Sequence, residues 1–395
     1  MPLSVQNANL PHLFCRPLLL LSVLLLFVAN AFHPGHANAA PAIAEVQGSV
    51  ADGSSIVITG TGFGTSGPNI LVFDDFENGT NGSATRTGSG SAQVGTWDSI
   101  GELPTRYSNA YAHSGSLSNM SNWADNGADE GSRWIGKTMT GGVTNVYFSW
   151  WVYLPANRDV PGTNSGYGPN WKIFWLYAEP WPTDDYVSVF LTNTLPVTNG
   201  GSGYFLTGYA DDWQDGRIDI NTSSGSTVTA FAKGQWHRYE YHFVADPISG
   251  SLTLWEHTAS QARRQLGTRT GKTVDAGGRW STLHFPGYGR GDNNSQTYYD
   301  DIYVASGPGA TARVEIGNNP TYAGSTNLAV STATSWSETR VVATVRRGSF
   351  SAGQTAYLYV VDANGNVNAQ GYPVSIGASA GTTDPPEAPS ALVVR

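Results

Sequence analysis

The sequence predicts an all-β protein that consists of two β-sandwiches. Short runs rich in aromatic and β-branched residues recur between turn signals, as in 145–154 (NVYFSWWVYL) and 235–244 (QWHRYEYHFV). The 395 residues include 47 Gly, 13 Trp and 19 Tyr but only 13% charged residues, a composition that suits tight turns and sheets rather than surface helices. No long segment has the apolar period of an amphipathic helix. The length favours two domains.

Residues 1–39 have the features of a secretory signal peptide. Arg16 precedes the apolar run 18–28, which is too short to span a membrane, and 37–39 (ANA) offers a cleavage site. The single cysteine, Cys15, would leave with this segment, so we expect no disulfide in the mature protein. Loss of Arg16 changes the net charge from −9 to −10, which argues against a nucleic-acid partner. We expect an exported monomer, secreted or periplasmic, without a stable membrane anchor.

Two segments far apart in the sequence look like the halves of one small domain. Residues 55–59 (SIVIT) alternate as a strand before GTGFG at 60–64, and the segment 335–377 opens with SWSET. These patterns resemble the immunoglobulin-like IPT/TIG domain. Neither half has enough strands for a core, so the resemblance implies a split domain, tolerable where chain ends lie close. Its parts would be 40–69 and 308–377, with 70–307 inserted. Two independent domains preceded by a stray strand are the alternative.

The C-terminal segment 378–395 is a Pro-rich tail. Its PPEAPSALVV resembles the start of a fibronectin type III domain, which suggests a truncated multidomain protein. As it stands, we expect the tail to be disordered.

Four motifs of the inserted segment occur in a characteristic order: FSWWVYLP at 148–155, NWK at 170–172, GQWHRYEYHF at 234–243 and YYDDIYV at 298–304. This order resembles the concanavalin A-like lectin and glucanase sandwich, especially its polysaccharide-lyase-like branch. The resemblance implies a two-sheet jelly roll whose concave face binds a polysaccharide or another glycan.

Candidate catalytic residues come from the strand 236–243. Period-two alternation places Tyr239, Tyr241 and Phe243 in the core and leaves a polar row on the other face. A solvated outer face explains such a row equally well, but the resemblance implies the concave one. For β-elimination on a uronic acid, which needs a base, a cation and an acid, we name Lys172, Arg238, Glu240 and His242. A non-catalytic lectin is the main alternative. A weaker one is a glycoside hydrolase with carboxylates paired among Glu179, Glu240 and Glu256.

Aromatic rings and carboxylates complete the predicted sites. Exposed aromatic faces are usual platforms for sugar rings, and we name Trp151, Tyr153, Trp175, Trp181, Trp213 and Tyr299. Strand parity points Asp300 inward, where a carboxylate needs a partner. Oxygen ligands suit calcium, so we predict a structural Ca²⁺ held by Asp75, Glu77, Asp300 and Asp301. Carboxylates that cap strand ends in water are the alternative.

Overall fold

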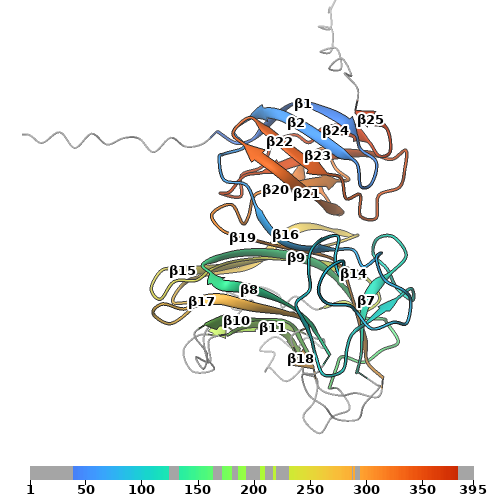
Figure 1. The fold of residues 1–395 in the computed structure, drawn as a ribbon, viewed down its shortest axis with the longest axis vertical. Helices are drawn as coiled ribbons and strands as arrows, with labels where there is room; N and C mark the ends of the chain where they lie inside the picture. Colours follow the sequence, from blue (N-terminus) through green and yellow to red (C-terminus); the bar gives the residue numbers. More distant parts are fainter. Residues whose placement is uncertain are drawn as a thin grey trace, which may run out of the picture. The chain divides into compact units, whose positions relative to one another are not determined.

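The computed structural model describes residues 39–123, 133–162, 171–179, 186–192, 205–209, 217–218, 231–286, 288–289 and 294–380. Within them the fold is all-β, as predicted, with antiparallel sheets that form sandwiches and one 3-10 turn, η2 (Tyr322–Gly324) (Figure 1). In this part of the chain no helix has the length and apolarity needed to cross a membrane. The predicted signal peptide and the tail from 381 lie outside the described residues.

The larger sandwich has two sheets. The first, here called the β14 sheet, runs in the order β16 (Gln261–Gly271), β15 (Gly250–Thr258), β14 (Trp236–Val244), β9 (Asn145–Tyr153), β19 (Gln296–Ser306), β3 (Asn69–Asp74) and β4 (Val94–Gly95), with β7 (Ser118–Asn122) on β19 and β6 (Arg106–Ser108) on β7. The second, the β10 sheet, runs β13 (Arg217–Ile218), β12 (Phe205–Tyr209), β11 (Tyr186–Thr192), β10 (Trp171–Glu179), β17 (Arg279–Phe285), β8 (Ile135–Val143) and β5 (Ser99–Ile100), with β18 (Tyr288–Gly289) on β10.

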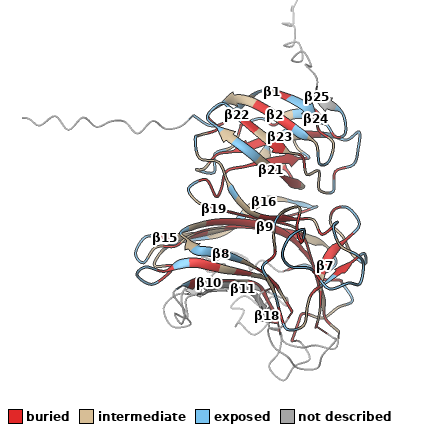
Figure 2. Ribbon diagram, viewed as in Figure 1, coloured by how far each residue is buried: buried red, intermediate tan, exposed pale blue. Residues whose placement is uncertain are grey.

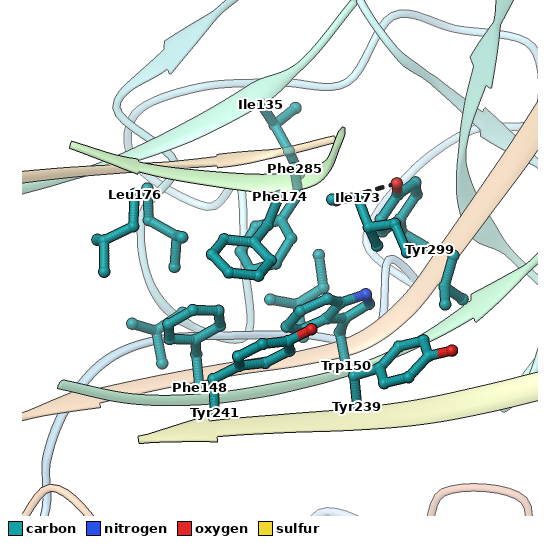
Figure 3. Close-up of a cluster of buried hydrophobic side chains, with 14 of the residues drawn as sticks. Ile135, Phe148, Trp150, Ile173, Phe174, Leu176, Tyr239, Tyr241, Phe285 and Tyr299 are labelled. Atoms are coloured by element: carbon teal, nitrogen blue, oxygen red, sulfur yellow. Dashed lines mark hydrogen bonds between the residues drawn. The ribbon is translucent and has the colours of Figure 1, made fainter. Parts of the chain in front are cut away.

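An aromatic core fills the space between these sheets (Figure 3). Trp150 of β9 stacks on Tyr241 of β14 at 5.2 Å, and Phe174 of β10 meets Tyr241 edge-on at 4.6 Å. Tyr239 and Phe243 belong to the same cluster, so the predicted parity of β14 is confirmed. Offset and edge-on ring pairs are the favoured geometries, each contributing about 0.5–1.5 kcal/mol beyond area burial.

The smaller sandwich joins the two ends of the described chain. Its strand order is β24 (Tyr372–Ser375), β23 (Thr355–Val361), β20 (Arg313–Gly317), β21 (Leu328–Ser337), β22 (Arg340–Thr344), β2 (Ser55–Thr61), β1 (Ala42–Ser49) and β25 (Ser379–Ala380). The early strand β2 pairs with the late strand β22, with Val57 opposite Val342 (Figure 1). Ile56 and Ile58 share a buried cluster with residues of β23, as one domain split between 40–69 and 308–377 requires.

The two quoted motifs of the split domain also meet. The indole Nε1 of Trp336 donates to the carbonyl oxygens of Phe63 and Gly64, each at 3.1 Å. A Cβ on Gly67 would lie 2.4 Å from the Cβ of Trp336, so this position has room for glycine alone. Two points stay predictions. One is that the small sandwich belongs to the IPT/TIG family, and the other is the set of domain limits.

The strand β9 is buried along nearly its whole length (Figure 2). Its inward side chains face the core, and its outward Tyr147 joins a second apolar cluster with Phe73, Tyr303 and, from the smaller sandwich, Val330. The outer face of the β14 sheet is therefore covered by the smaller sandwich over β3, β9 and β19.

Candidate functional site

The predicted polar row of β14 lies under the smaller sandwich and not in an open groove. Arg238 is 1% and Glu240 0% exposed, and His242 is half-buried. Arg313 and Glu315 of β20 contact this row. The expectation that these residues line the concave face beside Lys172 is wrong, because Lys172 belongs to β10 of the opposite sheet.

Glu240 is the centre of a buried ion cluster. Its carboxylate accepts hydrogen bonds from Nε and Nη2 of Arg263 at 2.9 and 3.1 Å, from the hydroxyl of Tyr147 at 2.8 Å, and from Nη2 of Arg313 at 3.3 Å. Although burial alone would raise it, the three arginines nearby hold the pKa of Glu240 well below its usual range. A carboxylate with so many donors is stabilised as an ion and is unsuited to take a proton from a substrate.

Glu315 is the second carboxylate of the cluster. It accepts from Nη2 of Arg238 at 2.5 Å, and the hydroxyl of Tyr322 donates to it at 2.5 Å. Nε of Arg313 lies 3.1 Å from the same carboxylate. Burial opposes ionisation here too, but Arg313 and Arg238 lower the pKa of Glu315. The Arg238–Glu315 and Arg313–Glu240 hydrogen bonds cross from one sandwich to the other, so this cluster joins the two.

A different group of side chains occupies the outer face of the β10 sheet. Trp175 and Tyr177 alternate on β10 with the core residues Phe174 and Leu176. Lys172 reaches the same face because the register of β10 shifts between Lys172 and Phe174, which leaves both Ile173 and Phe174 in the core. The rings of Trp175 and Tyr177 stack at 5.2 Å, and Nζ of Lys172 lies 5.6 Å from the centre of the Trp175 ring. Both rings are half-buried, and Lys172 is 7% exposed.

His284 of β17 extends this surface across the sheet. It lies 5.1 Å from Tyr177 and stacks on Trp134, which precedes β8, at 3.7 Å with an 8° interplanar angle. Burial lowers the pKa of His284 to about 4, so its imidazole is neutral near pH 7. A Cβ on Gly136 would lie 2.9 Å from the His284 ring and 3.0 Å from that of Trp134. Glycine at this position thus makes room for the stack.

We define the β10-face residues as Trp134, Lys172, Trp175, Tyr177 and His284. Sequence reasoning found Lys172 and Trp175 but missed the other three. The signal for His284 was available, because 282–285 (TLHF) alternates and puts His284 on the face opposite Leu283 and Phe285.

The remaining predicted platforms lie elsewhere. Trp151 is buried on the outer face of β9, where it stacks on His113 at 3.7 Å. Tyr299 is buried in the core and donates its hydroxyl to the carbonyl of Ile173 at 3.1 Å (Figure 3). Neither ring is open to a sugar, so both predictions are corrected. Tyr153 is half-exposed and stacks on Tyr111 at 4.6 Å, away from the β10 sheet. The predicted platforms Trp181 and Trp213 lie outside the described residues.

Two of the three carboxylates named for the glycoside hydrolase alternative are held in buried ion pairs. Glu256 is 1% exposed and binds Nη2 of Arg264 at 2.7 Å and Nδ1 of His237 at 2.9 Å. Glu240 is committed to the ion cluster. Glu179 ends β10 and is exposed.

The predicted calcium ligands are supplied with hydrogen-bond donors. Asp300 is fully buried, but its predicted inward orientation is wrong: the register of β19 against β9 shifts between Asp300 and Tyr303, so Tyr299 lies in the core and Asp300 lies opposite the outward Trp151. Its carboxylate accepts from the backbone N–H groups of His113 at 2.7 Å and Ser114 at 3.1 Å. Burial, and then Asp301, raise its pKa well above the usual value. Asp301 accepts from the Ser114 hydroxyl at 2.6 Å. Glu77 accepts from the N–H of Leu117 at 2.6 Å.

Asp75 completes this set and is hydrogen-bonded to the amide of Gln93. Among the described residues no group of three or more His, Cys, Asp or Glu side chains is arranged to hold a metal. The donors fit the alternative in which these carboxylates cap backbone groups. Calcium at this place stays a prediction.

No protein-family model matches the chain, and no curated protein matches it. Solved structures do. A mutant of alginate lyase Aly36B bound to an alginate tetrasaccharide is 10% identical, with a TM-score of 0.36 over 53% of this chain and 98% of that one. A GH131 β-glucanase catalytic domain from Podospora anserina is 16% identical, with a TM-score of 0.35 over 60% and 96%. Lectin II from Ulex europaeus is 9% identical, with a TM-score of 0.31 over 52% and 94%. Each is similar to part of this chain at low identity.

Proposed function

We propose that the protein is exported, binds a polysaccharide on the outer face of the β10 sheet, and cleaves it by β-elimination. The observation that carries the proposal is the set of β10-face residues. Half-buried Trp134, Trp175 and Tyr177 offer flat ring surface beside one cation and one neutral imidazole. Rings of this kind bind the apolar faces of sugars, and the polar groups among them set orientation.

The same residues supply the three roles of an elimination on a uronic acid unit. The cation of Lys172 would stabilise the substrate carboxylate as charge develops on it. Neutral His284 would take the C5 proton, and Tyr177, whose ring lies 5.1 Å from that of His284, would give a proton to the leaving O4. The C5–H and C4–O bonds break and a C4=C5 double bond forms, so no water and no metal enter the balance.

The test incubates the mature protein with uronic polysaccharides and neutral glycans, and follows the absorbance of the unsaturated product and the reducing ends separately. Tyr177→Phe should lower the rate of elimination about 100-fold with binding and melting temperature retained. Tyr153→Phe, the same change on the other sheet, should alter neither.

A non-catalytic lectin is the second candidate. It is favoured by the burial of Arg238 and Glu240 in the ion cluster, because this takes two predicted catalytic groups away from any ligand. Binding without an absorbance change and without new reducing ends would establish it. New reducing ends without absorbance would indicate hydrolysis and refute both candidates.

A further inference from the structure

A cleft of about 540 Å³ lies at the junction of the two sandwiches, on the β14 sheet and not on the β10 sheet that carries the β10-face residues. One wall comes from the outer face of β9, β14, β15 and β16, and contains Tyr147, His242, Trp255 and Arg263. The other wall comes from the smaller sandwich, with Arg313, Tyr322 and the turn 363–365. Its volume is in the range of small-molecule sites, which usually hold 300–1,000 Å³.

The charges behind this cleft do not balance. Three arginines, Arg238, Arg263 and Arg313, share two carboxylates, Glu240 and Glu315, and both carboxylates are fully buried. Three positive and two negative charges leave one positive charge over. The arginines Arg263 and Arg313 line the cleft, while the two carboxylates do not.

The neighbouring histidines do not change this charge. Burial, together with Arg313, lowers the pKa of His242 to about 4, and burial lowers the pKa of His257 well below its usual value, so both are neutral near pH 7. The carboxylate of Asp362 precedes the lining turn but does not line the cleft. It accepts from the N–H groups of Asn364 at 2.9 Å and Asn366 at 2.8 Å.

Arg263 presents this surplus charge next to aromatic surface. Its guanidinium lies 4.6 Å from the ring of half-buried Trp255 and 5.4 Å from that of Tyr322. Nε and Nη2 of Arg263 are held by Glu240, whereas Nη1 has no hydrogen-bond partner within the described part of the chain. The guanidinium is thus fixed in place with two N–H donors still available.

Two exposed amides stand at the rim. The side chains of Gln265 and Asn364 line the cleft and make no hydrogen bond to any described residue. A fixed cation, a flat indole and uncommitted amides are together the groups that recognise a sugar with a carboxylate.

We propose that this cleft is a second carbohydrate site, specific for an acidic sugar, with the sugar carboxylate on Nη1 of Arg263 and the sugar ring against Trp255. The site goes beyond the proposed function, because it lies on the other sheet and needs no catalysis. A neutral sugar would leave the surplus charge unused, and a bare anion would make no contact with the indole.

The test records the indole N–H resonances of the 13 tryptophans by NMR during titration with galacturonate, galactose or sulfate. The signal of Trp255 is identified from its loss in Trp255→Phe. Galacturonate should shift this signal saturably, and galactose and sulfate should bind at least tenfold more weakly. Equal binding of galactose or sulfate would overturn the proposed specificity, and an unshifted Trp255 signal would overturn the site.

A charge change at the rim gives the second arm. Gln265→Glu/Asn364→Asp adds two carboxylates without altering side-chain shape and should weaken galacturonate binding at least tenfold, at unchanged melting temperature. The control Asn78→Asp/Asn109→Asp adds the same charge at exposed positions elsewhere and should have no effect. Equal affinities of the two variants would contradict the proposal. The signals of Trp134 and Trp175 report on the β10 sheet separately, so failure of one site is distinguishable from failure of the other.

Discussion

Replacing Glu240 by Gln tests the ion cluster most directly. The change keeps the shape of the side chain but leaves Arg238, Arg263 and Arg313 with Glu315 as their one buried carboxylate. Breaking a buried ion pair from one side costs about 3–5 kcal/mol, since the partner charge stays buried and uncompensated. Glu240 accepts two hydrogen bonds from Arg263 and one from Arg313. We therefore expect a loss of folding free energy in the upper part of this range.

The free energy of unfolding is measured by urea titration, and the melting temperature should fall by about 10 °C. Glu102→Gln makes the same chemical change at an exposed position and should stay within about 0.5 kcal/mol of the parent protein. The double variant Glu240→Gln/Arg263→Gln removes one charge of each sign, so its loss should be smaller than the sum of the single losses by about 1–3 kcal/mol.

The opposite result would refute the reasoning. If Glu240 lined an open groove, Glu240→Gln would alter stability by less than about 0.5 kcal/mol and would lower turnover by about 100-fold. Strict additivity in the double variant would show that Glu240 and Arg263 are not coupled.

Three further predictions concern pH, packing and calcium. His242 and His284 have a folded pKa of about 4 against 6.5 for the free side chain, so the unfolded chain binds protons first. Stability should decline as pH falls from 6.5 to 4, by at most ~3 kcal/mol per histidine, and this histidine contribution should level off below pH 4. A flat urea midpoint across this window would contradict it. Gly136→Ala should displace the stack of Trp134 on His284 and cost about 1–3 kcal/mol of folding free energy. Calorimetry should then show weaker polysaccharide binding. In the control Gly353→Ala the new methyl meets no atom within 4 Å, and binding should stay intact. If calcium binds at Asp75, Glu77, Asp300 and Asp301 with about 2–3 kcal/mol, a chelator should lower the melting temperature by several degrees; no change would remove the calcium prediction.

The parity of β14 could be read from the sequence because alternation is a local property of a strand. Tyr239, Tyr241 and Phe243 had to share one face, whatever the rest of the chain did. That β2 shares a core with strands from the other end of the chain could also be predicted, since the strands at each end lacked partners for a core. Its pairing with β22 in particular could not.

Parity does not tell what covers the second face of a sheet. Arg238 and Glu240 are separated by one residue, and so are Arg313 and Glu315 of β20. Each strand therefore carries one charge of each sign on one face, and the two strands are complementary to each other. This repeated R-x-E pattern was the available signal for a buried interface, and a prediction made from β14 alone could not use it.

The contrast between β9 and β10 follows from the same distinction. A run such as 146–152, apolar or aromatic except for Ser149, is typical of a strand buried on both faces, and residues 146–152 are all buried. The Trp150–Trp151 pair therefore has one ring in the core and the other beneath a covering layer, with neither left for a ligand. On β10, by contrast, Trp175 and Tyr177 alternate with buried Leu176 and Ala178 and remain half-buried. An aromatic residue in an alternating strand is thus the better candidate for a sugar platform than one in a continuous apolar run, which is the physical reason to place the polysaccharide on the β10 sheet.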